Sequence, residues 1–267
     1  MDPIRLRTGD LPIGGVTHVM AVINVSPDSR NVQSVATSPS DALAMARRYR
    51  SAGASIIDIG GQSSHYENPT ITAEEEIERL IGAIELLVSD DFVVSVDTWK
   101  PAVAAASIEA GAVLLNDTGG LADPEMRRIA AMPGIGAFVM YIEGENPHAV
   151  DEVEIRRDKA SWTAQWLRAR LDELAAVGVT ETIVDPGISI NYRGDYEAYT
   201  TMQLDVIRGL GVIHDLGRPV LVPIPRKAEN HRVASYITMA IEHGADIIRV
   251  HDVEMACDLV RLFGRRI

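Results

Sequence analysis

The chain has 267 residues, 46% of them hydrophobic, and its 25 Lys and Arg against 38 Asp and Glu give a formal net charge of -13. This composition excludes a disordered polypeptide, and the negative charge argues against nucleic acid or an anionic membrane as the partner. The single cysteine allows no internal disulfide, no apolar run is long enough to cross a membrane and no signal segment opens the chain, so we expect a cytoplasmic protein.

Eight short apolar runs, rich in Val and Ile, alternate with helix-like stretches along the chain. Unbroken apolar runs of this kind are typical of parallel strands that are buried on both faces. Their strict alternation with helices, in a chain of about the usual barrel length, predicts an α/β fold: a single (β/α)8 TIM barrel that forms one domain over residues 1–267. The runs are 18–24, 55–61, 93–97, 113–117, 137–143, 182–187, 219–227 and 246–252.

The stretches between these runs carry helix signals. The first stretch begins near Asp41 and ends close to Gly53, a threonine and an acidic first turn open the second, and Pro101 opens the third. The segment 151–178, which mixes acidic and basic residues, is expected to be one extended helix. The expected helices cover about 40–53, 73–89, 101–112, 151–178, 197–210, 228–243 and 253–264.

Two connections, 25–40 and 61–72, are long, polar and rich in Ser, Asn and Pro. They follow the first two strands, so in a barrel they lie on the face that holds the active site. Long loops in compact domains usually serve as lids or binding loops. We therefore expect both connections to contribute to a binding site.

Polar side chains stand at the ends of most of the strand runs. Asp97, Asn116 and Asp185 combine two carboxylates with an amide, and such a set matches the donors and acceptors of an N–C–N edge, as in a guanidine-like heterocycle. An Asp at a strand end can also cap the following helix or turn, and for either Asp alone both interpretations are open. Asp117 is expected to support its loop rather than to contact a ligand.

Basic residues gather at the ends of the last two strands, where barrels often bind phosphate. Arg226 and Lys227 end the seventh run, while Arg249 and His251 alternate on the eighth and so point to the same side. Such a cluster would hold an anionic group locally, against the negative charge of the whole chain. Asn24, at the end of the first run, is expected to hold a Mg²⁺ ion that also contacts phosphate oxygens.

Seven segments form an ordered series of motifs: INVSPDS (23–29), GASIIDIGGQSS (53–64), SVDTWK (95–100), LLNDTGG (114–120), DPGI (185–188), PRK (225–227) and IIRVHDV (247–253). In their order and spacing they resemble the motifs of the dihydropteroate synthase family, over about residues 17–255. The resemblance implies a pterin-binding barrel.

The resemblance also implies an activity and a set of substrate contacts. Members of this family are transferases of folate biosynthesis that join a dihydropterin carrying a CH2-pyrophosphate to p-aminobenzoate and release pyrophosphate. By this resemblance Asp97, Asn116 and Asp185 would bind the edge of the pterin. Lys227 would contact a ring oxygen or nitrogen, and Arg249 would stack on or flank the ring.

The anion side of the site follows from the same resemblance. Arg249 and His251 would stabilise the leaving pyrophosphate, and Asn24 would hold the Mg²⁺ ion. Ser64 and His65, in the second long loop, would also contact the substrate. No protein nucleophile is required. The family further implies a homodimer that packs through its late helices.

The chain departs from the family pattern in the loops around the site. The family's second loop reads Glu-Ser-Thr-Arg-Pro-Gly where this chain has Gln-Ser-Ser-His-Tyr-Glu at 62–67, Arg30 replaces an aromatic residue, and Pro225 replaces a Ser where the aminobenzoate carboxylate would bind. Three hypotheses follow. The chain is a divergent synthase, a pterin or reduced-folate transferase of one-carbon units, or a pterin-binding protein without catalytic activity.

Overall fold

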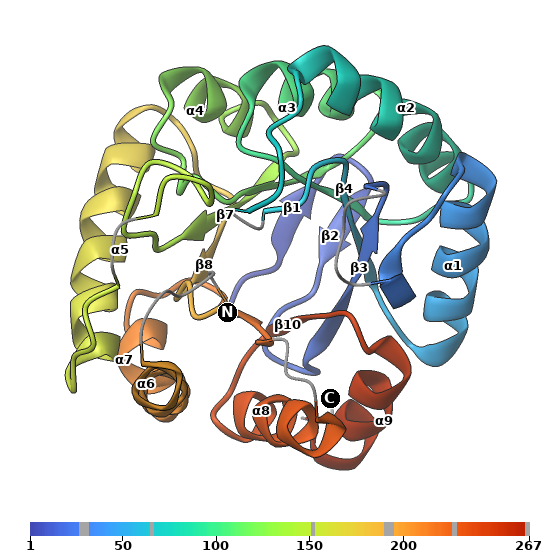
Figure 1. Cartoon of the computed structure of the whole chain (residues 1–267). Helices are drawn as coiled ribbons and strands as arrows, with labels where there is room; N and C mark the ends of the chain where they lie inside the picture. Colours follow the sequence, from blue (N-terminus) through green and yellow to red (C-terminus); the bar gives the residue numbers. More distant parts are fainter. Residues whose placement is uncertain (27–31, 65–66, 151–152, 190–194, 226–228, 265–267) are drawn as a thin grey trace.

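A barrel of eight parallel strands forms the centre of the molecule (Figure 1). The computed structural model describes residues 1–26, 32–64, 67–150, 153–189, 195–225 and 229–264. The barrel strands are β3 (His18–Asn24), β4 (Ile56–Gly60), β5 (Val94–Asp97), β6 (Leu114–Asp117), β7 (Gly136–Met140), β8 (Thr182–Asp185), β9 (Leu221–Pro223) and β10 (Ile247–Val250). They are ordered β8-β7-β6-β5-β4-β3-β10-β9, and a parallel bridge between Val184 and Val220 joins the two ends of the sheet. The predicted TIM barrel is confirmed, with each strand inside its predicted run or within one residue of it.

Helices form a ring around the strands (Figure 1). They are α1 (Pro39–Ala52), α2 (Ala73–Ser89), α3 (Pro101–Glu109), α4 (Pro124–Ala130), α5 (Lys159–Ala176), α6 (Tyr196–Arg208), α7 (Leu210–His214), α8 (Asn230–Glu242) and α9 (Val253–Phe263). In the part of the chain that the structure describes, none of these helices is both long and apolar enough to cross a membrane.

The start of α2 is fixed by a reciprocal capping box. Thr72 Oγ1 accepts a hydrogen bond from the backbone N–H of Glu75 at 3.2 Å, and the Glu75 carboxylate accepts one from the backbone N–H of Thr72 at 2.9 Å. This box satisfies two backbone donors that a helix start leaves without partners. It therefore defines the residue at which the second long loop ends.

The prediction of one helix over 151–178 is wrong at its start, because α5 begins only at Lys159. Ahead of it the backbone N–H of Glu154 donates to Glu143 Oε2 at 3.0 Å, so this polar segment binds to the loop that follows β7. The helices α4 and α7 and the 3-10 turn η1 (Val32–Ser34) were not predicted. Each is too short to show a periodic apolar pattern.

An antiparallel hairpin near the start of the chain, β1 (Ile4–Leu6) and β2 (Gly9–Leu11), was also not predicted. Its three apolar side chains are buried against residues from the first halves of the barrel strands, among them Met20, Leu114 and Phe138. The hairpin therefore covers the amino end of the barrel. Burial of one such side chain stabilises a fold by about 1.5–3 kcal/mol. The functional face is then the opposite, carboxyl end.

Candidate active site

Side chains from four strands meet at the carboxyl end of the barrel. Arg249 of β10 joins them: its Nε donates to Asp58 Oδ2 of β4 at 2.6 Å, and its Nη2 donates to Asp97 Oδ2 of β5 at 2.5 Å. Asn116 of β6, the register partner of Asp97, donates from Nδ2 to the same Asp58 oxygen at 3.2 Å. Three residues predicted to bind one ligand thus share a single hydrogen-bonded group. We call Asp58, Asp97, Asn116 and Arg249 the floor cluster.

Asp58 lies in the second strand run and is not one of the residues predicted to bind the ligand. Its side chain is 0% exposed, and its other oxygen accepts a hydrogen bond from Ser95 Oγ at 2.6 Å. Both oxygens are therefore engaged within the protein, so Asp58 orients Arg249 and Asn116 rather than a ligand. A carboxylate within an otherwise apolar buried strand must find such partners, and this was the signal in the sequence.

Asp185 ends β8, and the whole residue is only 3% exposed. Its Oδ1 accepts a hydrogen bond from the backbone N–H of Gly187 at 2.7 Å, so Asp185 does cap the turn that follows it. Burial raises the pKa of this carboxyl to about 7, although the bond from Gly187 and the charge of Arg249 lower it. Within the described part of the chain its second oxygen has no hydrogen bond of this kind.

Three carboxyl groups, those of Asp58, Asp97 and Asp185, surround the guanidinium of Arg249 in the described part of the site. Burial alone would lower the pKa of Arg249, but the carboxylates of Asp58 and Asp97 raise it, so the guanidinium stays charged. Burial raises the pKa of Asp97 to about 7, whereas Arg249 lowers it. Direct contact with the guanidinium favours the ionised form of Asp97. Among the described residues Arg249 forms ion pairs with Asp58 and Asp97 but not with Asp185.

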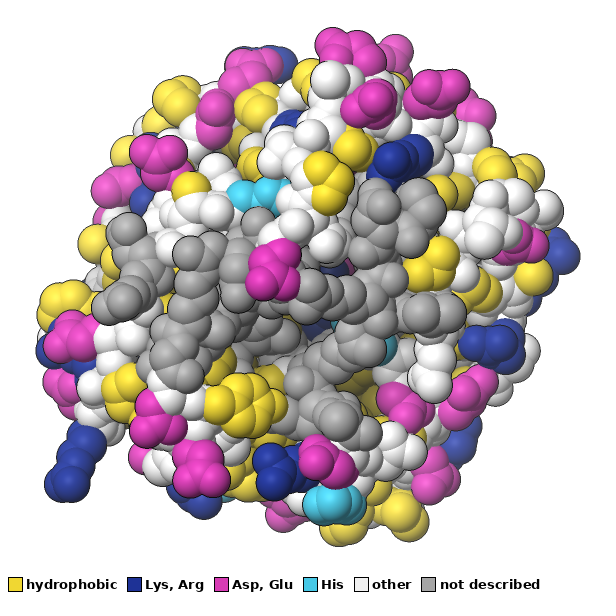
Figure 2. All heavy atoms as spheres, viewed as in Figure 1, with side chains coloured by type: hydrophobic (Ala, Val, Ile, Leu, Met, Phe, Trp, Pro, Cys, Tyr) yellow, Lys and Arg dark blue, Asp and Glu magenta, His cyan; other side chains and the backbone are white. Residues whose placement is uncertain are grey.

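A second polar group lies beside the floor cluster and joins the first and last barrel strands. Asn24 Nδ2 donates to Ser34 Oγ at 2.8 Å, and Ser34 Oγ lies 3.0 Å from His251 Nδ1. Ser34, in the 3-10 turn η1, is fully buried and was not predicted. This group brings together the residues predicted to bind metal and pyrophosphate. In the space-filling view most acidic side chains lie around the edge of the molecule (Figure 2).

The family of the chain follows from its similarity to known proteins. The family model described as pterin binding enzyme matches residues 20–251. The dihydropteroate synthase of Synechocystis is 32% identical over 93% of this chain and 90% of its own length. The chain belongs to the dihydropteroate synthase family. The family and the transferase class predicted from the motifs are thereby confirmed.

Other members of the family support the same assignment. The mitochondrial bifunctional folate synthesis protein of Arabidopsis thaliana is 30% identical, but the chain spans only 51% of its length. The dihydropteroate synthase of Thermus thermophilus, solved with 4-aminobenzoate, superposes with a TM-score of 0.82 at 29% identity and 98% coverage of each chain. That of Burkholderia cenocepacia, solved with 7,8-dihydropteroate, has a TM-score of 0.82 at 28% identity and covers 97% of this chain and 94% of its own.

Not every predicted site residue of this family member can be placed. Lys227 and His65 lie outside the described residues. Ser64 is described and exposed, in the second long loop. Asp117 supports its loop as predicted, because its two oxygens accept hydrogen bonds from the backbone N–H groups of Gly119 at 2.6 Å and Leu121 at 3.0 Å.

Proposed function

We propose that this chain condenses 6-hydroxymethyl-dihydropterin pyrophosphate with p-aminobenzoate or a related aromatic amine, in folate biosynthesis. The observation that carries the proposal is the floor cluster with Asp185 beside it, at the carboxyl end of a barrel of this family.

The hydrogen bonds of the floor cluster leave acceptors that suit a pterin. Arg249 occupies one oxygen of Asp97, and Gly187 occupies one oxygen of Asp185, so with respect to the described residues each carboxylate has a second oxygen that can accept from a ligand. Asn116 uses its Nδ2 on Asp58, which leaves its amide oxygen as a further acceptor. The amino-pyrimidine edge of a pterin presents N–H donors. Because a carboxylate accepts these bonds best when ionised, binding would release the proton of Asp185.

The reaction needs no protein nucleophile. The bond between the exocyclic CH2 and the pyrophosphate oxygen breaks, and the electron pair leaves with the pyrophosphate. The amine nitrogen forms the new C–N bond with its lone pair and loses a proton to solvent. Asp97 and Asp185, as anions at the ring edge, would stabilise the positive charge that develops on the pterin. His251 would contact the leaving pyrophosphate.

A magnesium ion fits the group formed by Asn24, Ser34 and His251. Because the Asn24 amide nitrogen is used on Ser34, its oxygen is the atom that would ligate the metal. Mg²⁺ is commonly held by one or two protein oxygens together with substrate phosphates, and no group of three or more His, Cys, Asp or Glu in the described residues offers an alternative metal site. When bound, the ion would neutralise charge on the pyrophosphate.

We also propose that the protein is a cytoplasmic homodimer. Support for a second copy comes from the end of α9, where Leu262 is 68% exposed and Phe263 is 44% exposed. Apolar side chains of this size gain from burial against a partner. Sedimentation of the protein and of the Leu262→Ser variant tests this: a wild-type monomer contradicts it.

Incubation with the pterin pyrophosphate and p-aminobenzoate, followed by assays of pyrophosphate and dihydropteroate, tests the function. Equal amounts of both products are expected. Calorimetry with pteroate, the pterin pyrophosphate and methyl-tetrahydrofolate separates the alternatives. Binding of pteroate and the pterin pyrophosphate without turnover would indicate a non-catalytic pterin binder, and preference for methyl-tetrahydrofolate would indicate a one-carbon transferase. If none of the three binds, the proposal is wrong.

A further inference from the structure

The second long loop, residues 61–72, which we call loop two, leaves the barrel next to the site. It starts after Gly60, which pairs in register with Asn24 on one side and with Asp97 on the other. It returns at Thr72, the N-cap of α2. The two limbs of the loop touch, because the backbone N–H of Ile71 donates to Gln62 Oε1 at 3.3 Å.

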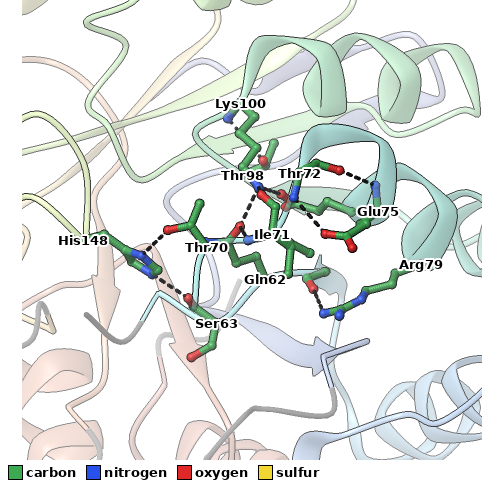
Figure 3. A network of polar contacts seen from close by, with 12 residues as sticks. Gln62, Ser63, Thr70, Ile71, Thr72, Glu75, Arg79, Thr98, Lys100 and His148 are labelled. Carbon is green, nitrogen blue, oxygen red and sulfur yellow. Dashed lines mark hydrogen bonds and ion pairs between the residues drawn. The ribbon is translucent and has the colours of Figure 1, made fainter. Parts of the chain in front are cut away.

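Lys100, from the segment after β5, ties these two limbs together (Figure 3). Its Nζ donates to Gln62 Oε1 at 2.5 Å, to the carbonyl of Ile71 at 2.6 Å and to the carboxylate of Glu76 at 2.9 Å. All three ammonium donors are therefore used, and Glu76 in α2 supplies the negative charge. Arg79 adds a bond to the carbonyl of Gly61 at 3.0 Å.

His148, from the loop that follows β7, ties the next pair of loop-two residues in the same way (Figure 3). Its Nε2 lies 2.9 Å from the carbonyl oxygen of Ser63, and its Nδ1 lies 3.0 Å from Thr70 Oγ1. A carbonyl only accepts, so Nε2 must carry a proton. Nδ1 can then accept from the Thr70 hydroxyl, or donate to it if the ring is charged, so both bonds persist in either state.

Hydrogen bonds and close packing fix the backbone on either side of His148 and the position of its ring. Asn146 Oδ1 accepts hydrogen bonds from the backbone N–H groups of His148 at 3.0 Å and Ala149 at 3.1 Å. At Gly144 a Cβ would lie only 2.3 Å from the carbonyl oxygen of Ala149, so the turn admits no side chain there. Trp99 packs on the imidazole, with 5.1 Å between ring centroids. These contacts hold the imidazole in place independently of its bonds to loop two.

We propose that His148 is a positioning residue for the condensation: with Lys100 it holds together the two described limbs of loop two, residues 61–64 and 67–72, beside the site, and we call this junction the neck. The proposal rests on the proposed function, because it assigns loop two to that same reaction. It also explains how a loop that departs from the family sequence is held. In the neck, Gln62, Ser63 and Thr70 of loop two are bound by Lys100, from the connection after β5, and by His148, from the connection after β7.

Hydrogen exchange of the substrate-free protein tests the neck directly. In His148→Ala the amides of loop two, including that of Ile71, should exchange about tenfold faster, as expected from the loss of one or two net hydrogen bonds, while α2 stays protected. His148→Gln, which keeps a donor for the Ser63 carbonyl, should restore part of the protection. His243→Ala, at an exposed histidine far along the chain, is the control. Unchanged exchange in His148→Ala would overturn the proposal.

Steady-state kinetics test the positioning role. In His148→Ala the KM for the pterin pyrophosphate or for p-aminobenzoate should rise about tenfold. The Kd for 6-hydroxymethylpterin, which lacks both the pyrophosphate and the amine, should stay within about twofold. Equal loss of both would show a general structural defect and overturn the role. If the wild type releases no pyrophosphate, the proposed function fails. In that case the exchange experiment still decides whether His148 closes the neck.

Discussion

The replacement of Asp185 by Asn should make the ligand-free protein more stable and its pterin binding weaker. Asn has the same shape, and its oxygen can still accept the hydrogen bond from Gly187. It cannot ionise, however, so the cost of a buried negative charge disappears. A stabilising change at a binding residue is expected where the site holds a charge for the ligand rather than for the fold.

The size of this effect follows from the pKa of Asp185. Burial raises the pKa to about 7 from the ordinary value of 3.8 for an aspartate, so the unfolded chain loses this proton at a lower pH than the native protein does. The contribution of Asp185 to stability is therefore complete below about pH 4 and is lost as the pH rises to about 7. One pKa unit corresponds to about 1.4 kcal/mol, so the loss amounts to roughly 4 kcal/mol at pH 8.

Urea unfolding at a series of pH values, followed by tryptophan fluorescence, measures this difference. Asp185→Asn and the wild type should have similar free energies of unfolding near pH 4 and should diverge as the pH rises. Asp215→Asn, at an exposed carboxyl, is the matched control and should not diverge. A difference between wild type and Asp185→Asn that does not depend on pH, or a variant that is less stable at pH 8, would refute the reasoning. Calorimetry with pteroate should show weaker binding.

Three further variants test the scaffold of the site. In Gly61→Ala the new Cβ would lie 2.9 Å from Glu76 Cγ, so thermal unfolding should show a loss of about 1–3 kcal/mol, whereas Gly211→Ala, with open space around it, should be neutral or stabilising. Arg249→Met leaves the buried carboxylates of the floor cluster without a cation, so urea unfolding at pH 7 should show a loss of about 3–5 kcal/mol. The loss should be smaller at pH 5, where these carboxylates take up protons, and a loss that does not depend on pH would contradict this explanation. Thr72→Ala removes the capping box and should cost about 1 kcal/mol of thermal stability, which Thr72→Ser should largely restore.

The sequence was most informative where one strand decides the position of a side chain. Asp97 and Asn116 stand at the ends of apolar runs, and the geometry of a parallel barrel is enough to bring them together, as their register pairing shows. The alternation of Arg249 and His251 likewise indicated that both belong to the same end of the barrel. These predictions needed only local patterns and one rule about strand ends.

The sequence was least informative where two connections meet. His148 stands in a polar loop, more than 75 residues from Ser63 and Thr70, and no local pattern links them. Ser34 is equally remote from His251. The start of α5 was misplaced because Glu143, earlier in the same connection between β7 and α5, binds the backbone ahead of the helix. Such contacts form only in the folded chain, so the pattern of a single segment cannot predict them.

The hairpin at the amino end of the barrel has a consequence for the order of folding. It precedes all eight barrel strands in the chain, yet its apolar side chains pack on Ile183, Leu221 and Ile247, and Arg5 pairs with Glu181, 176 residues further along. Its binding surface does not exist until the last strands are in place. Contacts between such distant residues slow folding. Until the barrel closes, the apolar side chains of this segment therefore have no surface to pack on, and a chaperone that binds short apolar regions would bind them.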